Sequence, residues 1–138
     1  MKDVFDKLSI RTTDYFAAID VDNESLLSKI CDSVKGIACA GEVGKKKFDN
    51  LKDVKIVKSL KQLDDSVFDK VLAKYSDTLN LKSLVRITDH FGMVLICNVP
   101  KNKVGILADV LGRKAGIFEL WSIPDKSSVD ILFKVRKY

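Results

Sequence analysis

The chain has 138 residues, of which 46% are hydrophobic and 31% are charged, and its formal net charge is +5. This composition excludes a disordered chain, and no apolar run approaches the roughly 18–20 residues of a membrane helix. The length predicts one domain over residues 1–138. The charged N-terminal segment lacks the apolar stretch of a signal peptide, so we expect a cytoplasmic protein with no membrane contact.

In the first half of the chain, hydrophobic spacing predicts a short opening helix, two longer helices and three extended segments. Residues 2–8 suggest a short helix, 9–21 an extended segment, and 23–35 an amphipathic helix that Asp22 or Asn23 can cap and Gly36 can end. Strands are predicted over 37–43 and 54–60. A second helix is predicted over 64–75, because Val67, Phe68, Val71, Leu72 and Tyr75 recur at helical spacing.

In the second half, two strands over 83–88 and 93–99 are predicted to form a hairpin around Asp89–Gly92. A third helix is expected over 101–115, with Gly116 as its stop, followed by strands over 118–123 and 129–135. The sequence therefore predicts an α+β fold in which helices cover a mostly antiparallel sheet.

Short echoes along the chain suggest two repeated halves, residues 1–61 and 62–138. The segment Val4–Lys7 recurs identically as Val67–Lys70, and Arg11–Phe16 matches Arg86–Phe91 at four of six positions. If the halves were related, each would contribute helices and strand pairs in the same order to one pseudo-symmetric sheet.

Positive charge is concentrated between residues 45 and 61. This segment contains seven lysines, namely Lys45, Lys46, Lys47, Lys52, Lys55, Lys58 and Lys61. Lysine gives point-charge contacts to phosphate, so the segment predicts salt-sensitive binding to the DNA or RNA backbone. The alternative is a lysine-rich strand edge that prevents aggregation.

Three residues are candidates for catalysis. Asp14 and Asp89 each follow a threonine at corresponding places of the suggested repeat, and two carboxylates brought together could share a proton or bind a divalent ion. His90 could act as a general acid or base beside Asp89. For each of the three, a turn or surface role is the alternative.

No cofactor or metal is expected from the motifs. The stretch Gly41–Lys45 lacks the first glycine and the final serine or threonine of a phosphate-binding loop. Cys31, Cys39 and Cys97 are widely spaced, and one histidine cannot complete a common zinc site with them.

Three hypotheses for function follow. The first is a small non-enzymatic binding module for an anionic partner, most plausibly nucleic acid. The second is a protein-interaction or dimerisation scaffold, because the order of elements loosely resembles that of roadblock and longin proteins. The third is a metal-dependent hydrolase or nuclease that uses Asp14 and Asp89.

Overall fold

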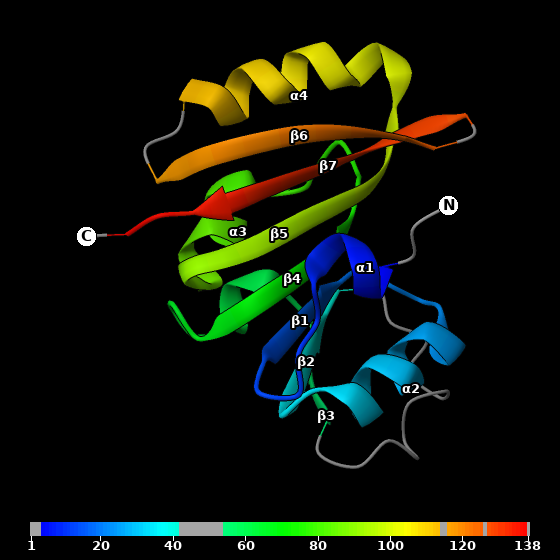
Figure 1. The fold of residues 1–138 in the computed structure, drawn as a ribbon, viewed down its shortest axis with the longest axis vertical. Helices are drawn as coiled ribbons and strands as arrows, with labels where there is room; N and C mark the ends of the chain where they lie inside the picture. Colours follow the sequence, from blue (N-terminus) through cyan, green and yellow to red (C-terminus); the bar gives the residue numbers. More distant parts are fainter. Residues whose placement is uncertain (1–3, 42–53, 114–115, 126, 138) are drawn as a thin grey trace.

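A seven-stranded sheet forms the centre of the molecule in the computed structural model (Figure 1), which describes residues 4–41, 54–113, 116–125 and 127–137. The strands are β1 (Tyr15–Ile19), β2 (Gly36–Ala40), β3 (Val54–Val57), β4 (Phe68–Lys74), β5 (Thr88–Pro100), β6 (Ile117–Asp125) and β7 (Ser128–Val135). Their order across the sheet is β3-β2-β1-β4-β5-β7-β6.

The sheet is mostly parallel. The pairs β3–β2, β2–β1, β1–β4 and β4–β5 are parallel, whereas β7 is antiparallel to both of its neighbours, β5 and β6. The predicted antiparallel sheet is therefore wrong. Parallel neighbours need crossover connections, and helices supply several of them.

Helices lie on both faces of the sheet. They are α1 (Val4–Leu8), α2 (Glu24–Ser33), α3 (Leu81–Ile87) and α4 (Lys101–Arg113), together with a short 3₁₀ helix, η1 (Leu60–Gln62). In the view of Figure 1, α1 lies in front of the sheet and α3 behind it. Leu8, Leu27 and Ile30 belong to one buried cluster, while Leu84, Ile87 and Leu111 belong to a second.

Two elements were predicted with the wrong type, each for a different reason. Residues 64–75 were expected to be helical, but Phe68–Lys74 is strand β4, in which Val71, Leu72 and Ala73 are all buried. A strand buried on both faces loses its polar alternation, so its apolar run can match helical spacing. Residues 83–88 were expected to be a strand, but Asn80 caps helix α3 there by accepting a hydrogen bond from the amide of Ser83.

The predicted hairpin is also absent, because Thr88–Pro100 is one strand. The backbone turns locally within it at Phe91, whose φ is 64°, and the pairing with β4 shifts register between Phe68 and Lys70. Gly92 follows this irregularity, and an added Cβ there would lie 2.5 Å from the Thr88 side chain. The glycine is needed for close packing and not for a hairpin turn.

The suggested internal repeat is wrong as well. Val4–Lys7 lies in helix α1, whereas its identical partner, Val67–Lys70, leads into strand β4. Arg11–Phe16 precedes and enters β1, whereas Arg86–Phe91 spans the end of α3 and the start of β5. The matching segments thus occupy different secondary structure.

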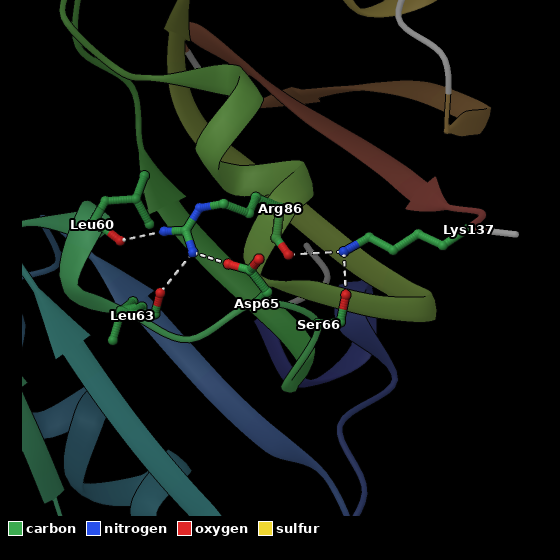
Figure 2. Close-up of polar contacts among 6 residues, drawn as sticks. All are labelled: Leu60, Leu63, Asp65, Ser66, Arg86 and Lys137. Carbon is green, nitrogen blue, oxygen red and sulfur yellow. Dashed lines mark hydrogen bonds and ion pairs between the residues drawn. The ribbon is translucent and has the colours of Figure 1, made fainter.

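Lys137, near the end of the chain, makes polar contacts with Ser66 and with helix α3 (Figure 2). The ammonium of Lys137 donates to the Ser66 hydroxyl at 2.7 Å and to the backbone carbonyl of Arg86 at 2.8 Å. Desolvation lowers the pKa of this ammonium.

Within the described residues, no helix is both long enough and apolar enough to cross a membrane.

Candidate site at the carboxyl ends of the parallel strands

The chain reverses its direction across the sheet between β1 and β4. From β1 it proceeds outward through β2 and β3, and then returns to place β4 on the other side of β1. In open sheets of this kind, ligands bind outside the carboxyl ends of the strands at such a switch point. The candidate ligand-binding region is therefore formed by the residues that follow Ile19, Ala40, Val57 and Lys74.

Two adjoining cavities lie in this region. The first has a volume of about 380 Å³ and is lined from β1, β2, the η1 turn and the β4–α3 connection. The second has a volume of about 390 Å³ and lies between the ends of β1 and β4. Asp20, Ser76 and Thr78 line both. Each volume falls in the range of about 300–1,000 Å³ that is usual for small-molecule sites.

Asp20 is positioned between the ends of β1 and β2. Its backbone amide donates to the Ala40 carbonyl at 2.9 Å, and its φ is 57°. A Cβ added to Gly41 would lie 1.8 Å from the Asp20 Oδ1. The Asp20 carboxylate can occupy this place only because residue 41 has no side chain.

We call the first cavity the basic cavity, because its described lining residues include Lys58 and Lys61 against one carboxylate, that of Asp20. Four of these described lining residues also have hydroxyl side chains. These are Ser59, Ser76, Thr78 and Ser83.

We call the second cavity the acidic cavity, because Asp20 and Asp22 line it against one ammonium, that of Lys74. Tyr75 also lines it and donates its hydroxyl to Asp77 at 3.0 Å. Desolvation, followed by the hydrogen bond to Asp77 and its negative charge, raises the pKa of the Tyr75 phenol. The phenol therefore stays neutral near pH 7, and the cavity has a net negative charge.

The predicted catalytic residues lie away from both cavities. Asp14 precedes β1, accepts from the Arg11 amide at 2.8 Å and pairs with Lys70 at 3.4 Å. Asp89 and His90 lie near the start of β5, at the same end of the sheet as Asp14 but with β4 between them. Two strand spacings separate the backbones of Asp14 and Asp89 by about 10 Å, and each carboxylate accepts a hydrogen bond from a backbone amide near it in the sequence.

The local contacts of Asp89 and His90 are structural. Asp89 accepts from the backbone amide of His90 at 2.8 Å, and His90 Nδ1 accepts from the amide of Lys137 at 2.8 Å. Among the described residues, no three histidine, cysteine, aspartate or glutamate side chains lie close enough together to hold a metal ion. The hydrolase hypothesis therefore has no assembled site in this part of the chain.

The lysine-rich segment is only partly within the described structure. Lys45, Lys46, Lys47 and Lys52 lie outside the described residues, Lys55 lies in β3, and Lys58 and Lys61 line the basic cavity. Binding of this segment to DNA or RNA, or of the chain to itself or another protein, stays a prediction.

Sequence reasoning missed Asp20, Asp22 and the Ser76–Asn80 connection as site residues. The signal was present, because Asp20 directly follows the apolar run Phe16–Ile19 and Ser76 follows the apolar run in β4. These polar residues become a site only when the strands before them are recognised as parallel neighbours.

Comparison with solved structures gives many methyltransferases. The chain superposes on the tRNA (m1A58) methyltransferase TrmI from Aquifex aeolicus with a TM-score of 0.76 and 13% identity, covering 96% of this chain and 66% of that one. The chain also superposes on a SAM-dependent O-methyltransferase from Thermotoga maritima with a TM-score of 0.75 and 11% identity, covering 95% of this chain and 62% of that one. A third structure is the N-methyltransferase NodS from Bradyrhizobium japonicum, in complex with S-adenosyl-L-homocysteine. The TM-score is 0.74 and the identity 10%, and the match covers 97% of this chain and 84% of that one.

These similarities define the class of fold: the chain has the Rossmann-like fold that these methyltransferase structures share. The chain spans about two thirds of the length of the Aquifex aeolicus and Thermotoga maritima structures. No protein-family model matches the sequence, and no curated protein matches it.

The fold corrects the functional hypotheses. The nucleic-acid module was inferred from the lysine-rich segment, the roadblock- or longin-like scaffold from the order of elements, and the hydrolase from Asp14 and Asp89. The fold shared with methyltransferases contradicts these functional hypotheses, and the mostly parallel sheet contradicts the order of elements behind the second.

Proposed function

We propose that the chain is a SAM-dependent methyltransferase domain that binds SAM in the cleft formed by the acidic and basic cavities. The observation that carries the proposal is the position of these cavities at the β1–β4 switch point of a methyltransferase fold. Bound SAM would supply a methyl group attached to a positively charged sulfur.

The charges of the cleft fit such a ligand. SAM carries a sulfonium, an ammonium and a carboxylate, and the described lining of the acidic cavity offers the carboxylates of Asp20 and Asp22 and the ammonium of Lys74. Opposite charges close to each other in a partly enclosed site attract more strongly than in water. The two aspartates would therefore hold the sulfonium and the ammonium of the cofactor, and Lys74 its carboxylate.

The adjoining basic cavity fits a nucleoside. Ile19, Leu60 and Leu79 provide apolar surface for a base, and the hydroxyls of Ser76 and Thr78 can hydrogen-bond to a ribose. The cavity thus combines a small apolar surface with a larger polar lining, as a base and a ribose together require.

One feature differs from a typical nucleotide-binding turn. The first strand–helix connection of Rossmann folds usually carries glycines that let the ligand approach the backbone. Here the connection is Asp20-Val21-Asp22-Asn23, and the Asn23 side chain accepts from the amide of Leu26 to cap α2. Binding would therefore depend on side chains, above all on Asp20, more than on backbone amides.

Isothermal titration calorimetry with SAM and with S-adenosylhomocysteine tests this proposal. We expect SAM to bind, and Asp20→Asn to weaken its binding about tenfold or more, the usual effect of losing one charge-assisted contact. Asp109→Asn is a matched control, because Asp109 is an exposed residue of α4 paired with Arg113. Folded wild-type protein that binds neither compound at millimolar concentration would contradict the proposal.

A further inference from the structure

The basic cavity has more positive charge than an uncharged nucleoside needs. Lys58 and Lys61 both line it, whereas the only acidic lining residue among those that the structure describes, Asp20, is shared with the acidic cavity. Lysine ammoniums are compact donors that suit the oxygens of a phosphate group. The two lysine side chains of the basic cavity could therefore bind an anion.

The turn that carries these lysines is fixed from within. Gln62 Oε1 accepts from the backbone amides of both Lys58 and Ser59 at 3.0 Å, and the Ser59 hydroxyl accepts from the amide of Lys61 at 3.3 Å. Because these backbone donors already have partners, an anion would have to be bound by the lysine side chains and neighbouring hydroxyls.

Arg86 fixes the same turn from the side of α3 (Figure 2). Its guanidinium donates to the Leu63 carbonyl at 2.8 Å and to the Leu60 carbonyl at 3.2 Å, and it pairs with Asp65. A turn held by both a capping box and an arginine loses little freedom when a ligand binds, which favours affinity.

The opposite wall is also ordered by its own contacts. The hydroxyls of Ser76 and Thr78 lie 3.3 Å apart, and Asn80 accepts from the Ser83 amide. Apolar surface from Ile19, Leu60 and Leu79 lies in the same cavity. Apolar surface for a base thus lies in the same cavity as hydroxyl-bearing residues and two lysines.

We propose that the basic cavity binds a phosphorylated nucleoside, with Lys58 and Lys61 contacting the phosphate. This inference goes beyond the function proposed above, because SAM has no phosphate. The nucleoside of SAM and the phosphorylated nucleoside would occupy the same cavity, so the two ligands would compete for it. The ligand class follows from the pairing of an apolar surface with two lysines in a space of about 380 Å³.

Titrations with adenosine and with its 2′-, 3′- and 5′-monophosphates test the proposal. We expect at least one monophosphate to bind about tenfold or more tightly than adenosine, as expected for a charge-assisted contact. Lys58→Ala and Lys61→Ala should each reduce this ratio and leave the affinity for adenosine unchanged. Lys101→Ala, an exposed lysine at the start of α4, is the matched control and should leave the ratio unaltered.

Several results would overturn the inference. These are equal affinity for adenosine and all its monophosphates, absence of binding by all of them, or a ratio that both lysine variants leave intact. Inorganic phosphate binding as tightly as the best monophosphate would also overturn it, because the cavity would then be a simple anion site.

The same titrations separate this inference from the proposed methyltransferase function. Monophosphates that bind through Lys58 and Lys61 while SAM does not bind would remove the SAM proposal alone. SAM binding that depends on Asp20, combined with no preference for monophosphates, would remove only the phosphate inference.

Discussion

The ammonium of Lys7 lies 2.7 Å from the Asp130 Oδ2, and both side chains are almost fully buried, with 8% and 5% exposed. The two residues are 123 positions apart and join helix α1 to strand β7. The other oxygen of Asp130 accepts from the backbone amide of Asn98 at 3.2 Å, where β5 has a register shift in its pairing with β7. This carboxylate thus holds α1, β5 and β7 together.

Replacing Lys7 with methionine should destabilise the protein, because it leaves the Asp130 carboxylate buried without its cation. Breaking one side of a buried ion pair typically costs about 3 kcal/mol or more of unfolding free energy. Urea denaturation measures this change. Arg113→Met removes an exposed pair with Asp109 and should have little effect. Equal effects of the two variants would contradict the structural role of the Lys7–Asp130 pair.

Replacing Arg86 with alanine should loosen the η1 turn, because two backbone carbonyls lose their donor. Two charge-assisted hydrogen bonds of this kind predict a loss of about 2–3 kcal/mol of unfolding free energy. Hydrogen exchange should also become faster at the amide of Leu63, which donates to the Leu60 carbonyl inside the turn. Denaturation and exchange measurements test the two effects separately.

Asp65→Ala is the control for this variant. It removes the ion-pair partner of Arg86, but the Asp65 side chain is 73% exposed, and the carbonyl contacts remain. We therefore expect a small change in stability and normal exchange at Leu63. If Asp65→Ala were as disruptive as Arg86→Ala, the carbonyl contacts would not be what fixes the turn.

Much of the local structure could be predicted from the sequence because it depends on neighbouring residues. Helix α2 was predicted with Asn23 as a possible cap, and Asn23 does accept from the Leu26 amide. Helix α4 and the last two strands were also predicted close to their observed bounds. In β7, Ile131 and Phe133 are buried in the same cluster as Leu107 and Leu111 of α4.

The sheet topology and the site could not be predicted in this way, because they depend on contacts between distant residues. Val71 and Leu72 belong to different buried clusters on the two faces of β4, so the strand shows no alternation. Once β4 was taken for a helix, the parallel order around it could not be recovered. Without β1 and β4 as parallel neighbours, the sequence gives no indication that Asp20 and Ser76 line the same cavities.

The buried thiols of Cys39 and Cys97 should make stability depend on pH in the alkaline range. Burial raises both pKa values from the ordinary 9.0 to about 11, with the charges of Cys31 and Asp130, respectively, adding to the effect. Between pH 9 and pH 11 the unfolded chain loses these protons while the folded chain retains them, so stability falls as pH rises.

The expected loss is on the order of 1–3 kcal/mol for each thiol by pH 11. Urea denaturation from pH 7.5 to pH 10.5 measures its onset. Cys39→Ala and Cys97→Ala should each make the decline shallower than in the wild-type protein, whatever their effect at pH 7.5. An unchanged slope in both variants would show that other groups cause the decline.

Replacing Gly41 with alanine should damage both the fold near the cleft and ligand binding. The φ of Gly41 is 85°, a conformation that costs a residue with a side chain roughly 1–2 kcal/mol, and the added Cβ would collide with the Asp20 carboxylate. Displacement of Asp20 removes the carboxylate that both cavities share. We expect lower stability together with at least tenfold weaker SAM binding, the equivalent of one lost charge-assisted contact.

Gly105→Ala is a matched control from helix α4. A Cβ added there meets no atom within 4 Å, and alanine is favoured over glycine in a helix by about 1 kcal/mol. This variant should therefore be slightly more stable than the wild-type protein and should bind ligands equally well. Thermal denaturation and calorimetric titration of both variants test the pair. If Gly41→Ala retained full affinity for SAM, the proposed role of Asp20 in the cleft would be wrong, because its carboxylate cannot keep its present place beside the new side chain.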